Sequence, residues 1–233
     1  MRKLLYVPII HSASDLGSIG VAIDKRSASL CGEGRWADHK ETVTMFWKNV
    51  ADYVLSLDAA SLKIYQDGLA ADGELGRRIV EEAAKRGSMN HRVILQLLSK
   101  GAEVRKTEDV SLLTEELRLA CEEPTGGDIS NNRQLTLKKS RLMEERDRFI
   151  AKAISETLRQ GETAILFIGA YHNVQLYLPR DITVEYLKEQ ERVSAYFEEL
   201  ISGGKGSRFQ ELTRYLASPI DDTAEPSMLM PNS

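Results

Sequence analysis

The sequence is poor in cysteine, proline and aromatic residues. Only two of its 233 residues are cysteine and six are proline, and aromatic residues make up 6% of the sequence. A chain of this length buries enough surface to fold without disulfide bonds. Cys31 and Cys121 are also far apart in the sequence. We therefore expect reduced thiols and a cytoplasmic protein.

Neither a surplus of basic residues nor a long apolar segment is present. The 31 Lys and Arg residues are outnumbered by 35 Asp and Glu residues, which gives a net charge of −4. Nucleic acid is therefore not an expected partner. The longest apolar run, 164–170, is far below the ~20 residues of a membrane span, so no membrane association is expected. Residues 1–10 lack the cleavage site of a signal peptide and favour a first strand.

Short apolar runs alternate with long amphipathic segments, and this alternation indicates the fold. Four runs are predicted strands, at 4–10, 62–65, 102–105 and 164–168, and 182–187 is a fifth candidate for the sheet edge. Apolar residues at helical spacing predict helices at 37–57, 73–86, 89–98, 110–121, 130–159, 191–201 and 207–216. The order predicts an α/β fold. A mainly parallel sheet of four to five strands has helices on both faces, and a long helix precedes the last core strand.

We expect one domain over residues 1–217. The segment 218–233 contains three of the prolines and no helical or strand period, so it is predicted to be a disordered tail.

Polar residues follow the predicted strands, where a parallel sheet places its ligand sites. His11 follows the first strand, Asp67 the second, Glu108 the third and His172 the fourth. Two imidazoles with carboxylates can bind a divalent transition metal or perform general acid–base chemistry. Each residue also has a structural interpretation. Asp67 precedes a glycine and can form a turn, whereas Glu108 precedes a helix and can favour its dipole.

Arg146 is unusual because it lies on the apolar face of the long predicted helix. Leu142, Phe149 and Ile150 mark that face, and a guanidinium there must reach solvent, a carboxylate or a ligand. We favour an open pocket in which Arg146 awaits an anionic ligand, with a protein carboxylate as the alternative partner. The neighbouring Asp147 is expected to face solvent.

Two blocks of the sequence carry a resemblance to a known group. Residues 142–151, LMEERDRFIA, and 161–172, GETAILFIGAYH, resemble the C-terminal signature of the TraB/Tiki/GumN and ChaN/erythromycin-esterase-like superfamily. The N-terminal VPIIH, ending at His11, is similar to the first Gly-x-x-His of that group, with proline in place of glycine. Asp67 stands where an acid often ends the second strand.

The resemblance implies a parallel α/β fold with a pocket formed by His11, Asp67, Arg146 and His172. It does not imply one activity. The Tiki branch resembles metal-dependent proteases, the esterase branch hydrolyses a lactone without a metal, and the ChaN branch binds haem.

These observations together predict a hydrolase-like enzyme acting on a small-molecule or peptide ligand. His11, Asp67 and His172 would hold Mn, Co or Zn, or would activate water with help from Glu108. Arg146 would bind an anionic group or stabilise developing negative charge.

Two other interpretations stay open. In one, the same pocket binds haem or an anion without catalysis. In the other, the chain is a structural partner whose tail docks on another protein. The sequence also leaves a homo-oligomer open.

Overall fold

The strands form one parallel sheet, as the sequence predicts. The computed structural model describes residues 1–9, 29, 31–121, 129–203 and 206–220, and omits the side chains of 120–121 and 129–132. All strand pairings in this part are parallel, in the order β3-β2-β4-β1-β5. The strands are β1 (Arg2–Ile9), β2 (Leu62–Gln66), β3 (Glu103–Arg105), β4 (Thr163–Gly169) and β5 (Ile182–Tyr186).

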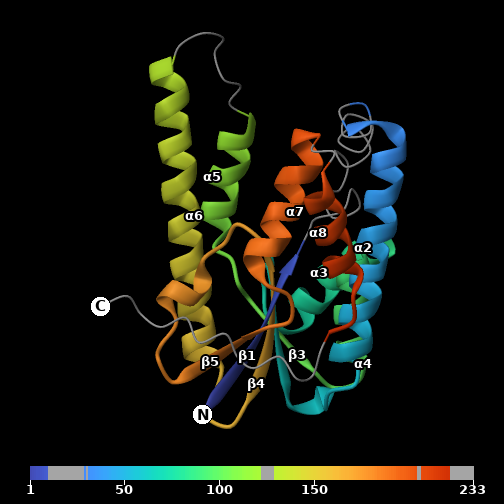
Figure 1. Ribbon diagram of the computed structural model, residues 1–233. Helices are drawn as coiled ribbons and strands as arrows, with labels where there is room; N and C mark the ends of the chain where they lie inside the picture. The colour runs from blue at the N-terminus through green and yellow to red at the C-terminus, as the bar shows by residue number, and fades with distance from the viewer. Residues whose placement is uncertain (10–28, 30, 122–128, 204–205, 221–233) are drawn as a thin grey trace.

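Helices cover both faces of this sheet (Figure 1). On one side lie α2 (Glu33–Val54), α3 (Gly73–Lys85), α4 (Met89–Ser99), α7 (Gln190–Ser202) and α8 (Ser207–Ala217). On the other lie α5 (Val110–Cys121) and the long α6 (Ile129–Thr157), which leads into β4. Short 3-10 turns, η2 (Ala59–Ser61) and η3 (Val174–Tyr177), complete the order. The predicted fold class is confirmed, including the fifth strand at the edge beside β1.

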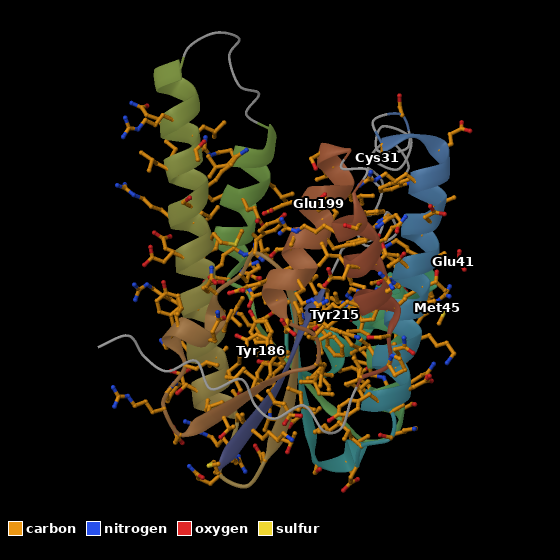
Figure 2. The ribbon with its side chains drawn as sticks, viewed as in Figure 1. Cys31, Glu41, Met45, Tyr186, Glu199 and Tyr215 are labelled. Carbon is orange, nitrogen blue, oxygen red and sulfur yellow. The ribbon has the colours of Figure 1, made fainter. Side chains whose placement is uncertain are left out.

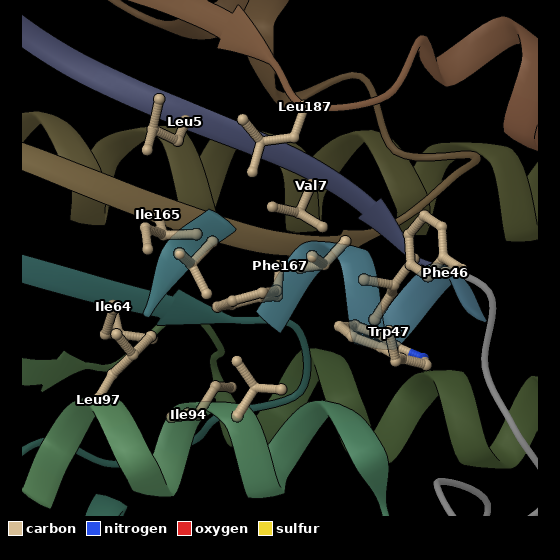
Figure 3. Packing of buried hydrophobic residues seen from close by; sticks show 14 of the residues in the cluster. Leu5, Val7, Phe46, Trp47, Ile64, Ile94, Leu97, Ile165, Phe167 and Leu187 are labelled. Carbon is tan, nitrogen blue, oxygen red and sulfur yellow. The ribbon is translucent and has the colours of Figure 1, made fainter. Parts of the chain in front are cut away.

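The alternation of side chains along the central strands divides the core into two layers. In β1, Leu5 and Val7 pack toward α2 and α4, together with Phe167 of β4 (Figure 3). Phe46 and Trp47 of α2 meet edge to face in this layer, with ring centroids 5.2 Å apart. Both strands are apolar at nearly every position because side chains on each face are covered by helices.

The second layer lies between the sheet and α6. Leu4 and Tyr6 of β1 pack there against Ile150 and Ile154 of α6. Tyr65 of β2 shares this layer, and its hydroxyl lies 2.7 Å from the Thr157 hydroxyl. The apolar stripe of α6 therefore fixes the helix across the sheet and carries its middle turns to the carboxyl edge. No helix in the described ranges is both long and apolar enough to cross a membrane.

The chain after α8 stays in contact with the domain for three more residues. The Lys188 ammonium, 3% exposed as a residue, donates to the backbone oxygens of Ser218 and Pro219 at 2.8 and 3.3 Å. It also lies 4.8 Å from the ring centre of Tyr215, which Figure 2 labels on α8. Ile220 packs against the core. Residues 221–233 of the predicted tail lie outside the described residues.

Two truncations test where the folded unit ends. Removing 221–233 is expected to leave the melting temperature nearly unchanged. Removing 218–233 withdraws carbonyl acceptors from the buried Lys188, so we expect a loss of about 1–3 kcal/mol of unfolding free energy. Urea denaturation of the full chain and both truncations measures this difference. Equal stability of the two truncations would contradict it.

Candidate functional site

The candidate site lies at the carboxyl edge of the sheet, beside the neighbouring strands β2 and β4. The chain continues from these two strands on opposite faces of the sheet. After β2 the chain passes to α3 and α4 on one face. After β4 it passes to η3, which packs against α6 on the other face. A parallel sheet opens a crevice where this happens. Asp67 follows β2 and His172 follows β4, so both residues stand at this point.

Arg146 of α6 is enclosed by carboxylates of the protein. Its Nη2 donates to Asp67 Oδ1 at 2.8 Å and to Glu108 Oε1 at 2.5 Å, and its Nε donates to Glu108 Oε2 at 3.2 Å. Its Nη1 donates to Glu116 Oε1 of α5 at 2.7 Å. The residue is 4% exposed, so these bonds lie largely away from bulk water. The preferred expectation of an open anion pocket at Arg146 is thus wrong, and the alternative, a protein carboxylate, is confirmed.

Burial and charge act against each other in this cluster. Burial raises the pKa of Glu108, which is fully buried, although the Arg146 guanidinium favours its ionised form. For Arg146, burial acts to lower the pKa. Hydrogen bonding to Glu108 and the charges of Asp67 and Glu116 outweigh the effect of burial, so the pKa of Arg146 is raised. The cation is therefore permanent, and it compensates carboxylates that would otherwise be costly to bury.

His172 is oriented by Asp147, the residue that follows Arg146 on α6. His172 Nδ1 lies 2.5 Å from Asp147 Oδ1, and Asp147 Oδ2 accepts the Asn173 backbone N–H at 2.8 Å. On the other side of the ring, Nε2 lies 3.7 Å from Asp67 Oδ2. Asp67 Oδ2 also accepts the Gly169 backbone N–H at 3.1 Å. An imidazole held between two carboxylates is suited to proton transfer.

The loop that carries His172 is held from two further sides. The buried Tyr6 hydroxyl donates to the His172 backbone oxygen at 3.2 Å. Gln190, the first residue of α7, donates from Nε2 to the same oxygen and to the Ala170 oxygen. Burial raises the pKa of Tyr6 above its ordinary range, so this hydroxyl stays protonated and remains a donor. The position of His172 therefore depends on β1 and α7 as well as on α6.

The structure brings together four of the five residues predicted for the site: Asp67, Glu108, Arg146 and His172. His11 lies outside the described residues.

The expectation that Asp147 faces solvent is wrong, since the residue is 3% exposed. The prediction rests on a single apolar stripe of α6. In the fold, α6 contacts both α5 and η3, which buries a wider arc of the helix. Sequence reasoning also missed Glu116. The one available signal was that it shares a face of α5 with Leu112 and Leu119.

The predicted metal centre gains no support from the described ranges. They contain no group of three or more His, Cys, Asp or Glu side chains that could hold a metal ion. Asp67 is bonded to a guanidinium and a backbone N–H, and His172 Nδ1 is bonded to Asp147. A cation would also lie close to Arg146. Asp67 and His172 thus already have hydrogen-bond partners, and the Mn, Co or Zn site that also includes His11 stays a prediction.

Comparison with protein-family models finds no match, and comparisons with curated proteins and with solved structures find none either. The superfamily resemblance stays a prediction.

The contact with Asp147 predicts the tautomer of His172. An ionised carboxylate only accepts hydrogen bonds, so the neutral ring must carry its proton on Nδ1 and leave Nε2 as the acceptor. We expect ¹⁵N NMR of the imidazoles at pH 8 to show an Nδ1–H signal that disappears in His172→Gln. An Nε2–H signal assigned to His172 would contradict this arrangement.

Removing the Arg146 guanidinium should strongly destabilise the fold at neutral pH. Arg146→Ala leaves Glu108 and Asp67 buried without their cation, which we expect to cost about 3–5 kcal/mol of unfolding free energy. Arg148→Ala is the matched control. Arg148 lies on the same helix in an exposed ion pair with Glu144, so its loss should cost less than about 1 kcal/mol.

The cost of Arg146→Ala should also depend on pH. Without the cation, the pKa of buried Glu108 rises further above its unfolded value. The folded variant then binds more protons than the unfolded chain, and its stability is lost as pH rises through this raised pKa. The difference from wild type should therefore be smaller at pH 5 than at pH 7.5. Urea denaturation at both pH values tests this, and a pH-independent difference would contradict it.

Proposed function

We propose that the protein is a hydrolase that uses His172 as a general acid–base group at the carboxyl edge of the sheet. The observation that carries the proposal is the 2.5 Å contact between His172 Nδ1 and Asp147 Oδ1, with Nε2 directed at the side of Asp67. A carboxylate in this position keeps the ring in one tautomer and stabilises the imidazolium that forms when Nε2 takes a proton. The resemblance of residues 161–172 to an esterase-containing superfamily supports the same interpretation.

In this proposal His172 and Arg146 have different roles. His172 Nε2 removes a proton from water as the water attacks a carbonyl or phosphoryl centre, and returns that proton to the leaving group. Arg146 is a positioning residue in this scheme. It holds the Asp67 carboxyl group in place beside the ring, and it does not serve as the anion receptor that the sequence predicted.

The proposed ligand is a small molecule or peptide, and the proposed location is the cytoplasm. Support for the location comes from the low cysteine content. The non-catalytic alternative of anion binding at Arg146 loses support because its guanidinium already bonds three carboxylates.

Turnover of simple substrates tests the proposal. The full chain is incubated with p-nitrophenyl acetate, p-nitrophenyl phosphate and a fluorogenic peptide, with EDTA or with added Mn, Co or Zn. We expect hydrolysis of at least one substrate in EDTA. We also expect a loss of about 10²–10⁴-fold in kcat for His172→Gln and for Asp147→Asn.

Matched controls separate chemistry from folding. His91→Gln changes a histidine on α4, and Asp52→Asn changes an exposed carboxylate paired with Lys48 on α2. Both should retain wild-type turnover. Hydrolysis that persists in His172→Gln would refute the role of His172 as the general acid–base group. Hydrolysis that requires added metal would favour the hypothesis of a metal-dependent hydrolase.

A further inference from the structure

A cavity between α5 and α6 is the feature that the proposed reaction does not use. Its volume is about 220 Å³. The described residues that line it, three of them apolar, are Glu116, Leu119, Lys139, Leu142 and Met143. Ligand pockets that enclose a whole drug-sized molecule begin at about 300 Å³. The cavity is therefore suited to a short apolar chain.

The ionic cluster stands between this cavity and His172. Glu116 lies at one end of the cavity, and its carboxylate accepts from Arg146 Nη1 at 2.7 Å. The Arg146 guanidinium also bonds Asp67 and Glu108, so bonded side chains fill the way to the imidazole. A ligand of the cavity therefore occupies a site of its own, and its binding does not depend on the proposed reaction.

Lys139 places a positive charge at the other end of the cavity. On α6 it precedes Leu142 by three positions, so the two side chains share a face of the helix. It precedes Arg146 by seven positions, which separates the two residues by about 10 Å along the helix axis. Within the described ranges, no hydrogen bond or ion pair joins the Lys139 ammonium to another side chain. The cavity thus combines apolar walls with a lysine charge that no carboxylate offsets.

The charges around the two ends of the cavity are of opposite sign. The segment 129–143 contains no acidic residue and four basic ones, Arg133, Lys138, Lys139 and Arg141. On α5, Glu115 is already paired with Arg118 at 2.6 Å. The end at Glu116 is acidic by contrast, because three carboxylates share one guanidinium there. An anion is therefore attracted at Lys139 and repelled at Glu116.

We propose that this cavity binds a small amphiphilic anion, a free alkyl carboxylate such as butanoate or hexanoate. The carboxylate lies at the exposed Lys139 ammonium, and the unbranched chain points between the apolar walls. Burial of each added methylene should tighten binding about fourfold until the cavity is filled. An ion pair with an exposed lysine should add about two- to fivefold.

Met143 provides a direct reporter of occupancy. The full chain is labelled with ¹³C at the methionine methyl groups and titrated with butanoate and hexanoate. The Met143 signal is assigned by its loss in Met143→Leu. We expect its shift to saturate, with affinity rising about tenfold from butanoate to hexanoate. The methyl group of Met45, on α2 at the far side of the molecule from α6, should not shift (Figure 2).

Probes of one chain length test the charge of the ligand. Hexan-1-ol should bind about two- to fivefold more weakly than hexanoate, and hexylammonium about tenfold more weakly. Salt screens an exposed ion pair, so the preference for hexanoate over hexylammonium should shrink in about 0.5 M NaCl. Equal binding of hexanoate and hexylammonium at low salt would overturn the proposal.

Lys139→Gln removes the charge and keeps most of the side-chain length. We expect the hexanoate affinity to fall about two- to fivefold, to that of hexan-1-ol, while the binding of hexan-1-ol is unchanged. Lys152→Gln is the matched control on the same helix. Lys152 lies outside the cavity, 3.9 Å from Glu156, so its loss should leave hexanoate binding intact. Hexanoate binding that Lys139→Gln does not weaken would overturn the proposal.

Two tryptophan substitutions on α6 locate the alkyl chain. Leu142→Trp fills the cavity and should abolish the saturable shift caused by hexanoate. Leu137→Trp is the matched control, because Leu137 is 51% exposed, and it should leave the shift intact. If Leu142→Trp fails to fold, Lys139→Gln at its exposed position decides the test. Binding that survives in folded Leu142→Trp, or shifts that never saturate in the wild type, would overturn the proposal.

The C-terminal segment 221–233 is the competing occupant of the cavity, because it contains three acidic residues and the apolar run from Met228 to Met230. The truncation that lacks 221–233 is therefore titrated with hexanoate beside the full chain. We expect equal affinities. Hexanoate binding that appears only after truncation would identify this segment as the occupant, and the proposal of a free carboxylate would be wrong.

Discussion

The buried guanidinium of Arg146 is the constraint on which the carboxyl edge depends. It joins α6 to β2 through Asp67, to the segment after β3 through Glu108, and to α5 through Glu116. Replacing such a cluster with apolar residues can leave a protein equally stable, so the cluster is not explained by stability alone. Its geometric effect is specific. It fixes one Asp67 oxygen, and the other Asp67 oxygen is left on the side of His172.

Consecutive residues of α6 serve the two halves of the site. Arg146 supplies a positive charge toward β2, and Asp147 supplies a negative charge toward the loop after β4. Side chains of neighbouring helical positions diverge by about 100°. Both can be buried only because α6 passes between α5 and η3 at the edge of the sheet. Two neighbouring charges on one helix thus orient both groups of the site. Arg146 positions Asp67, and Asp147 positions the His172 imidazole.

The fold was predictable from the sequence because its signals are short in range. Apolar runs covered on both faces identify β1 and β4, and helical spacing identifies the long α6. Strand ends are local too, which is why Asp67, Glu108 and His172 could be placed at one edge before their partners were known. The contacts of Arg146 could not be chosen in this way, because its carboxylate partners are 30 to 79 positions away in the chain. The prediction that Asp147 faces solvent was wrong for a related reason. Its burial depends on η3, which follows β4 in the chain.

The same helix also carries apolar residues on both sides of the ionic cluster. Leu142 and Met143 stand one turn before Arg146 and Asp147 on a helix whose next turns are locked to the sheet by Ile150 and Ile154. A rigid helix transmits a displacement at one turn to the next, because its backbone hydrogen bonds span four residues. The two residues of α6 that orient Asp67 and His172, Arg146 and Asp147, are therefore parts of one rigid element. A substrate at the imidazole would therefore meet groups held in a fixed position, which is the condition that positional catalysis requires.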